Sequence, residues 1–161
     1  MKRTCPLLTA ILLHALLAAA ACGTKNIPNT RVPDNGDNRE VLDFVEKYRK
    51  AVEERDIGAL LGMTSRDYFD DMGTPQGEDD IDYDSLQVGL KRLRQEVLGA
   101  RYQISYRAVT FTENQKVLVD LLYTGWFKVA TPEGEQWRRR LEPHRIVLAK
   151  EDRGFKIVSG M

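Results

Sequence analysis

Three side chains in the last third of the chain, Asp120, Tyr123 and His144, are of types that could perform acid–base chemistry. His144 could serve as a general base, because imidazole titrates near neutral pH. Asp120 interrupts an apolar run, and burial of its carboxyl group would raise the pKa toward a range that suits proton transfer. Tyr123 or His144 would then act as its polar helper. These residues are the candidates for a catalytic site.

Each candidate also has a purely structural interpretation. His144 follows Pro143 and has no evident partner nearby in the sequence, so it could be an exposed or structural histidine. Asp120 could point away from the core, or could pair with an arginine such as Arg107 or Arg139. We favour these structural interpretations, so the sequence predicts no catalytic residue with a defined role.

An acidic segment offers weak support for a cation site. Asp80, Asp82 and Asp84 have the alternating spacing that opens a calcium loop. A calcium loop of the EF-hand type requires Gly at its sixth position and Glu at its twelfth. Ser85 and Lys91 stand at those positions instead. We therefore expect no metal site and no cofactor.

Charge and aromatic content argue against nucleic acid as a partner. The 161 residues carry 24 Lys and Arg against 24 Asp and Glu, and a near-neutral domain has no general attraction for a polyanion. The arginines of 138–140 would alternate between the faces of a strand, so they form no single basic stripe. Trp126, Phe127 and Trp137 are expected in the core or in a pocket wall rather than as a stacking platform.

The first 22 residues have the three parts of an export signal. Lys2 and Arg3 give a positive start, residues 7–21 are mostly apolar, and small residues precede Cys22. This order is typical of a secretory signal. The apolar stretch is shorter than the roughly 20 residues that a membrane-spanning helix needs.

The tract Ala19-Ala20-Ala21-Cys22 resembles the lipobox of bacterial lipoproteins. The resemblance implies a signal peptide over residues 1–21 and a lipid, with palmitate among its chains, on Cys22 of the mature protein. Ala19 departs from the family, which usually has Leu or Val there, and the alternative is an ordinary cleaved signal. Gly23 is not the Asp of an inner-membrane retention signal. We therefore expect a lipid-anchored protein of the bacterial cell envelope, at the outer rather than the inner membrane.

Removal of the signal leaves about 140 residues, which suits one domain. Cys5 and His14 would leave with the signal, and Cys22 would carry the lipid. The domain then has no cysteine for a disulfide, a thiol nucleophile or a metal site. Residues 22–38 are rich in Asn, Pro, Asp and Gly and are predicted to form a flexible tether, with the domain over 39–161.

Helical periodicity dominates between residues 37 and 99. Asp37 and Glu40 have the spacing of a capping box, and a run of apolar residues at helical spacing follows them. Asp56 is expected to cap a short second helix over Ile57–Met63. Both helices would turn one apolar face to the core.

A third helix is predicted from Asp84, which has a capping-box partner three residues later, to about Leu98. Before it, Tyr68 and Phe69 are expected to fill the core. The third helix has an apolar stripe of Leu86, Leu90, Leu93 and Val97.

From residue 101 the pattern changes to the alternation of strands. Four strands are predicted, over residues 101–112, 115–130, 135–150 and 155–159. The phase of the first slips near Ala108, which predicts a bulge. The second is apolar on both faces, which predicts a central strand covered on both sides. Pro143 in the third indicates a bulge or an edge position.

These elements predict an α+β fold with about three N-terminal helices on a strongly curved antiparallel sheet of about four long strands. The chain from about residue 39 to 160 resembles the nuclear-transport-factor-2-like (NTF2-like), or SnoaL-like, family. The resemblance lies in Val-x-x-Phe-Val-x-x-Tyr of the first helix, in 55–61 (Arg-Asp-Ile-Gly-Ala-Leu-Leu) and in 154–160 (Gly-Phe-Lys-Ile-Val-Ser-Gly). It implies a cone-shaped sheet around a pocket, and it transfers no catalytic residue. The family includes isomerases, cyclases, dehydratases, hydrolases and proteins that only bind.

We expect a protein that binds a small apolar ligand or a protein partner without catalysis. The alternative is an isomerase, cyclase or hydrolase that uses Asp120 in the pocket with Tyr123 or His144. A third interpretation is a homodimer that buries the open face of the sheet. The enzyme interpretation requires two ionisable side chains that face one cavity within hydrogen-bond reach, so the positions of Asp120 and His144 decide it.

Overall fold

A computed structural model describes residues 25–74, 77–152 and 154–161. The predicted signal over residues 1–21 and the predicted lipidation site Cys22 lie outside the described residues. The helices are α2 (Gly36–Glu54), α3 (Ile57–Met63), the 3-10 helix η2 (Gly77–Asp79) and α4 (Tyr83–Glu96). The strands are β1 (Phe69–Asp70), β2 (Ile81–Asp82), β3 (Val97–Phe111), β4 (Lys116–Thr131), β5 (Gly134–Glu151) and β6 (Gly154–Ser159).

The segment before α2 packs on the domain. Asn26 and Pro33 form a β-bridge, and Val32 between them is fully buried in the core. The N–H of Arg31 donates to the carbonyl oxygen of Tyr106 in β3 at 3.3 Å. The residues described here, from Lys25 onward, are packed, whereas a flexible tether was predicted over residues 22–38. The physical reason is that the apolar residue Val32 is buried in the core, and its burial holds the adjacent residues against the domain.

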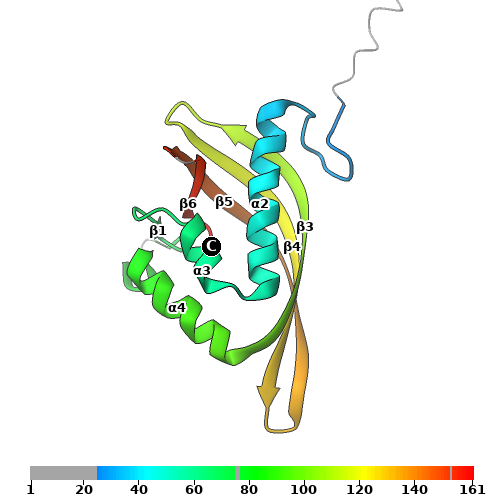
Figure 1. The fold of residues 1–161 in the computed structure, drawn as a ribbon, viewed down its shortest axis with the longest axis vertical. Coiled ribbons are helices and arrows are strands. Elements are labelled where there is room, and N and C mark those ends of the chain that lie inside the picture. Colours follow the sequence, from blue (N-terminus) through cyan, green and yellow to red (C-terminus); the bar gives the residue numbers. More distant parts are fainter. Residues whose placement is uncertain (1–24, 75–76, 153) are drawn as a thin grey trace, which may run out of the picture.

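Helix α2 begins one residue after Asn35, whose side chain accepts a hydrogen bond from the N–H of Asn38 at 2.8 Å. Asn35, and not the predicted Asp37, therefore caps the helix. The helix ends where Arg55 adopts a left-handed conformation with φ of 54°. The described start and end leave a helix of 19 residues that crosses the sheet beside β3 (Figure 1).

Helix α3 begins at the predicted cap, because Asp56 accepts a hydrogen bond from the N–H of Ala59 at 2.9 Å. After it, Tyr68 is buried as expected, but Phe69 is 54% exposed. The two residues are neighbours on an extended segment, so their side chains point in opposite directions and only one can reach the core.

Helix α4 is capped by Asp82 rather than by the predicted Asp84, since the Asp82 carboxylate accepts from the N–H of Ser85 at 2.8 Å. The helix ends at Glu96, before the end predicted at Leu98. Its predicted stripe is only partly buried, because Leu93 is 50% exposed. The chain passes directly from α4 into β3, so the last residue of the stripe, Val97, belongs to the strand.

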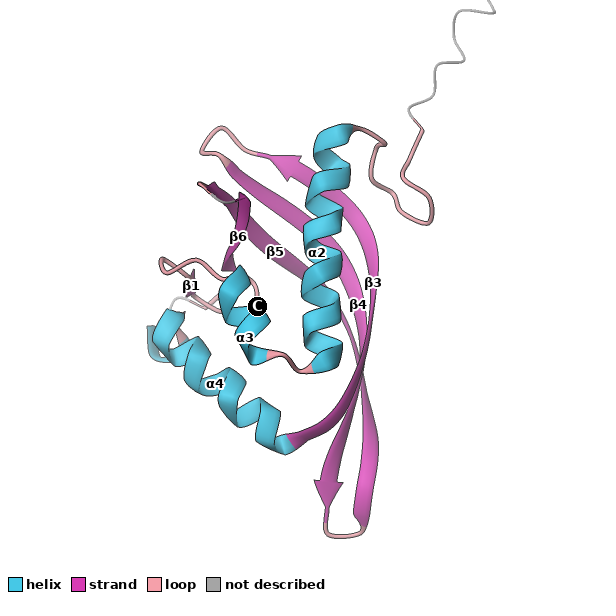
Figure 2. Cartoon of the chain, in the orientation of Figure 1, coloured by secondary structure: helices cyan, strands magenta, loops and turns pink. Residues whose placement is uncertain are grey.

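The main sheet is antiparallel with the strand order β3-β4-β5-β6, and it confirms the predicted α+β order (Figure 2). β4 is an interior strand, as predicted. The register between β3 and β4 shifts between Tyr106 and Ala108, which confirms the predicted bulge. β6 pairs with β5 only from Val147 onward, so β5 is an edge strand at Pro143, and the register with β4 does not shift there; of the two predicted alternatives, the structure has the edge and not the bulge.

The two faces of the sheet differ in their covering. The inner face carries Tyr102, Tyr106, Val119 and Leu121, which are buried against α2 and the other helices. On the outer face, alternate residues of β4 such as Leu118 are only half-buried. The prediction that β4 is covered on both sides was therefore wrong, because among the described residues the helices pack on one face.

The β4–β5 hairpin extends past the helices to one end of the molecule (Figure 2). The residues of β5 from Gly134 to Pro143 are all exposed. The described segment before α2 lies toward the opposite end of the longest axis (Figure 1). Within residues 25–74, 77–152 and 154–161, no helix has the length and apolar character needed to cross a membrane.

Candidate functional site

Asp120 lies on the outer face of the sheet. Its carboxylate forms an ion pair with Arg145, the residue directly opposite it on β5, with Nε–Oδ1 and Nη2–Oδ2 distances of 2.7 and 3.2 Å. The partner is neither Arg107 nor Arg139, which the sequence suggested. Asp120 is therefore no buried acid of an inner pocket. This corrects the enzyme interpretation that was built on it.

His144 lies on the inner face, because it pairs with the inward-facing Leu121 of β4. Its Nε2 atom lies 2.9 Å from the carbonyl oxygen of Gly160. A carbonyl oxygen can only accept, so Nε2 carries the hydrogen and donates it. His144 and Asp120 thus occupy opposite faces of the sheet, and they cannot act together on one substrate.

Tyr123 lies on the same face as His144, and their rings meet edge to face with centroids 5.7 Å apart. The Tyr123 hydroxyl donates a hydrogen bond to Oε2 of Glu142 at 3.0 Å. Burial raises the pKa of Tyr123, and the Glu142 carboxylate that accepts its proton adds to the rise. The phenol therefore stays protonated and acts as a donor at neutral pH.

Tyrosine rings fill the inner face where a pocket was expected. Tyr48 of α2 meets Tyr102 edge to face at 6.4 Å, and Tyr102 stacks on Tyr123 at 5.0 Å with an interplanar angle of 20°. Burial raises the pKa of the Tyr48 and Tyr102 hydroxyls. This series of rings packs the space between α2 and the sheet with neutral aromatic groups.

Two further tyrosines use carboxylates as hydrogen-bond acceptors. The hydroxyl of Tyr106 donates to Glu46 at 2.7 Å, and that of Tyr68 donates to Asp70 at 3.3 Å. Burial is the main cause that raises the pKa of Tyr106, and it raises the pKa of Tyr68 to about 12. The ionisable groups of this face thus satisfy one another rather than converging on an open cavity.

The last two residues of the chain lie inside this inner network (Figure 1). The N–H of Gly160 donates to Asp70 at 2.7 Å, and the N–H of Met161 donates to the Tyr68 hydroxyl at 3.1 Å. Gly160 has φ of +80°, and a Cβ atom there would lie 2.0 Å from the carbonyl oxygen of Arg145. Only glycine can make this close approach.

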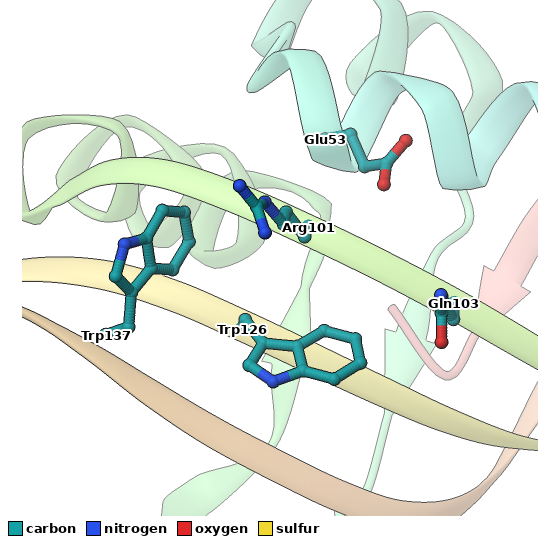
Figure 3. Close-up of a pocket in the computed structure, with 5 residues that line it drawn as sticks. All are labelled: Glu53, Arg101, Gln103, Trp126 and Trp137. Carbon is teal, nitrogen blue, oxygen red and sulfur yellow. The ribbon is translucent and has the colours of Figure 1, made fainter.

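An open cleft of about 300 Å³ lies instead where the outer face of the hairpin meets the edge of β3. It is lined by Glu53 of α2, Arg101 and Gln103 of β3, Trp126 of β4 and Trp137 of β5 (Figure 3). Four of the five lie on three adjacent strands, so the sheet register fixes their spacing.

The strand pairing explains why the two indoles share the cleft. Arg101 lies opposite Trp126 across β3 and β4, and the Arg101 guanidinium stands 5.2 Å from the ring centroid of Trp137. Gly99 leaves room for the Trp137 ring, since a Cβ atom there would touch it at 3.4 Å. Arg139 stands 5.8 Å from the Trp126 ring. Each indole is thus paired with one guanidinium by a cation–π contact.

Glu53 joins α2 to the exposed edge of β3. One carboxylate oxygen accepts the backbone N–H of Tyr102 at 2.9 Å, and the other accepts from Arg49 at 2.6 Å. The N–H of Tyr102, followed by Arg49, holds the pKa of Glu53 below its ordinary value of 4.5. Arg49 also donates to the Tyr102 carbonyl oxygen at 3.2 Å. The cleft therefore has one wall that is ionised at neutral pH and fixed in position.

Sequence reasoning missed most of this cleft. It placed Trp126 and Trp137 in the core or in a pocket wall, and both do line the cleft, with Trp137 47% exposed. It did not single out Glu53, Arg101 or Gln103. One signal was available, because the two tryptophans flank the predicted turn at positions that pairing puts on the same face. Within the part of the chain that the structure describes, no three His, Cys, Asp or Glu side chains lie together so as to hold a metal ion.

Comparisons with known proteins identify the fold. No protein-family model matches the sequence, and no curated protein matches it significantly. A conserved protein from Planctomyces limnophilus matches with a TM-score of 0.63 and 13% identity over 77% of this chain and 92% of that one. A candidate dehydratase of the NTF2-like family from Streptomyces avermitilis matches with a TM-score of 0.61 and 15% identity, over 77% and 93% of the two chains.

A third similar structure is a candidate calcium/calmodulin-dependent protein kinase II association domain from Xanthomonas campestris. It matches with a TM-score of 0.62 and 15% identity over 87% of this chain and 94% of that one. At this level of identity the likeness concerns the fold alone. The protein has an NTF2-like fold, in agreement with the resemblance seen in the sequence, and this fold supports many functions.

Proposed function

We propose that the chain is a non-enzymatic binding protein of the bacterial cell envelope, anchored by a lipid on Cys22. The observation that carries the binding role is the outer cleft, where two indoles, a guanidinium, an amide and a carboxylate converge. Concave sites with aromatic walls and a few placed polar groups are typical of ligand binding.

The inner face supports the same proposal, because its ionisable side chains are engaged in hydrogen bonds within the protein. His144 uses Nε2 to donate to Gly160, and Tyr123 donates to Glu142. A general base needs an unshared nitrogen or oxygen close to the proton that it removes. The catalytic alternative would have to use Nδ1 of His144, the ring nitrogen that this tautomer leaves unprotonated, without Asp120, which lies on the other face of the sheet.

Native mass spectrometry of the full-length protein, purified without denaturation, tests the binding role. We expect a retained adduct of defined mass in the wild type and its loss in the Trp126→Ala variant. The Val88→Ala variant is the control, because Val88 is an exposed residue on α4, away from the cleft. An adduct that survives Trp126→Ala would contradict binding in the cleft.

The lipid anchor is tested separately. We expect the Cys22→Ser variant to lose the mass of the lipid and to leave the membrane fraction. Cys5→Ser is the matched control, since Cys5 lies within the predicted signal and should not change either property. Membrane association and a mass offset that do not change in Cys22→Ser would remove the lipoprotein proposal.

The exposed apolar side chains of the hairpin favour self-association as a second candidate. Trp137 and Leu141 are 47% and 51% exposed on the outer face, and exposed apolar groups of this size tend to mark contact surfaces. A homodimer would cover them. Sedimentation over a range of concentrations tests this, and a monomer at all concentrations would count against it.

A further inference from the structure

The chemistry of the outer cleft indicates the class of ligand that it would bind. Trp126 and Trp137 offer flat apolar walls that remain partly open to solvent. Gln103 offers a planar amide that can both donate and accept hydrogen bonds. A ligand that suits this lining has an apolar face and hydroxyl or amide groups around its rim. A pyranose ring has this combination, because its C–H groups form flat faces and its hydroxyls point outward.

The charge of the cleft favours an acidic ligand. Among the described residues, Arg101 and Arg139 take part in cation–π contacts but in no ion pair with a carboxylate within 4.0 Å. Arg49 lies 2.6 Å from Glu53 and 2.7 Å from Glu46, so one guanidinium is shared by two carboxylates, and Arg101 and Arg139 supply the remaining positive charge beside the cleft. The guanidinium of Arg101 can therefore pair with an anion, and a guanidinium binds a carboxylate through two parallel hydrogen bonds.

The edge of β3 beside the cleft does not accommodate an added peptide strand. A peptide that extends a sheet uses the free N–H and C=O groups of the edge strand. At Tyr102 both groups are occupied, the N–H by Glu53 at 2.9 Å and the C=O by Arg49 at 3.2 Å. Side chains, and not the backbone, would make the contacts in the cleft.

The position of the cleft also argues against a lipid headgroup. The hairpin that carries both tryptophans projects to one end of the longest axis, and the described segment before α2 lies toward the other end (Figure 1). A chain anchored through Cys22, three residues before Lys25, would turn this hairpin away from its own membrane. The cleft would then face the material outside the bilayer.

We propose that the cleft binds a saccharide ring that carries a carboxylate. The ring stacks on an indole, Gln103 and the free lone pairs of Glu53 receive its hydroxyl groups, and Arg101 pairs with its carboxylate (Figure 3). A volume near 300 Å³ lies at the lower end of the range for ligand pockets, which suits a small sugar unit rather than a large apolar ligand. This inference rests on the proposed binding function and narrows it to one class of ligand.

Tryptophan fluorescence of the full-length protein tests the proposal directly, because both tryptophans of the chain line the cleft. The test ligand is the disaccharide of N-acetylglucosamine and N-acetylmuramic acid, which carries one carboxylate. Its uncharged counterpart is N,N′-diacetylchitobiose. We expect a saturable change in emission with the acidic disaccharide at a lower concentration than with the uncharged one.

Arg101→Gln is the diagnostic variant. Loss of a hydrogen-bonded charge pair should weaken binding of the acidic disaccharide by roughly 10-fold or more and leave binding of the uncharged one unchanged. Arg138→Gln is the matched control, since Arg138 lies on the same hairpin but pairs with Phe127 on the opposite face. Trp126→Phe, which keeps an aromatic wall, should retain binding and report through the single remaining tryptophan.

Three results would overturn the proposal. Emission that does not change with either disaccharide would remove the ligand class, and equal binding of both would remove the role of Arg101. An equal loss of affinity for the acidic disaccharide in Arg101→Gln and Arg138→Gln would show that the overall charge of the protein, and not a contact with Arg101, attracts the ligand. These failures can be told apart from failure of the proposed binding function. If native mass spectrometry shows an adduct that is lost in Trp126→Ala, the cleft still binds a ligand, but one of another class.

Discussion

Glu53 makes a connection whose loss can be measured, because its carboxylate ties α2 to the edge of β3. We predict that Glu53→Gln destabilises the protein by about 1 kcal/mol at pH 7. The amide can still accept the Tyr102 N–H, but that bond loses its charge-assisted part, worth about 1 kcal/mol, and the half-buried pair with Arg49, four residues away on α2, is worth about 0.5 kcal/mol or less. Glu53→Ala leaves the N–H without an acceptor and should cost about 1–3 kcal/mol.

The same carboxylate predicts how this difference depends on pH. The pKa of Glu53 is lower in the folded protein than its ordinary value of 4.5, chiefly through the Tyr102 N–H. A group whose pKa is lowered by folding stabilises the fold fully above its unfolded value, and this stabilisation is lost as the pH falls through the folded pKa. The difference between wild type and Glu53→Gln should therefore be constant above about pH 5 and should shrink below pH 4.5.

Urea unfolding of the full-length protein between pH 7 and pH 3 provides the assay. Glu54→Gln is the matched control, because Glu54 is the exposed neighbour at the end of α2 and carries the same charge. The reasoning would be refuted by equal destabilisation in Glu53→Gln and Glu54→Gln. It would also be refuted by a difference that does not change as the pH falls.

Further predictions concern the C-terminal residues, the inner face and the outer ion pair. Gly160→Ala should destabilise the fold by at least about 2 kcal/mol in urea unfolding, because of its φ and the contact with a carbonyl oxygen. Gly62→Ala, where no atom lies within 4 Å of the added methyl group, should be neutral or stabilising. Tyr106→Phe should cost about 1 kcal/mol, through loss of one hydrogen bond, and a loss near zero would show that the bond is not formed in solution. Asp120→Ala should lower the free energy of unfolding by less than about 1 kcal/mol and leave ligand binding intact. A loss of binding in this variant would show that Asp120 contributes to the binding site.

The order and type of the main elements could be predicted from the sequence, because hydrophobic period and turn residues are local signals. The phase slip at Ala108 predicted the bulge, and Pro143 indicated a bulge or an edge, of which the structure has the edge. The helix-capping residues Asn35 and Asp82 were harder to predict. Two acceptable capping residues stand close together in each case, and tertiary packing selects between them.

The candidate site was much less predictable. Period-2 alternation shows which residues share a face, but it does not show which face the helices cover. The apolar residues Leu118 and Leu122 suggested two covered faces, whereas the helices cover one and leave these residues on the other. Asp120 alternates with the buried Val119 and Leu121, so its outward position follows once the inner face is known.

The cleft depends on long-range geometry that no local pattern contains. Glu53 reaches Tyr102 over 49 residues of sequence, and Trp137 finds space above Gly99 two strands away. The length of the hairpin beyond the helices is likewise set by how far α2 and α4 extend across the sheet. Such features require the assembled fold, and the sequence alone could only suggest that the tryptophans share a face.

The central claim is that this domain binds its ligand on the outer face and not inside the cone. Tryptophan and tyrosine resonances can distinguish the two locations, because both tryptophans line the outer cleft and all six tyrosines are buried. The measurement is NMR of the full-length protein with ¹⁵N-labelled tryptophan and ¹³C-labelled tyrosine, titrated with the acidic disaccharide. We predict that both indole N–H resonances shift while the tyrosine ring resonances stay in place. Tyrosine shifts with unchanged indole resonances would place the ligand inside the cone and contradict the account.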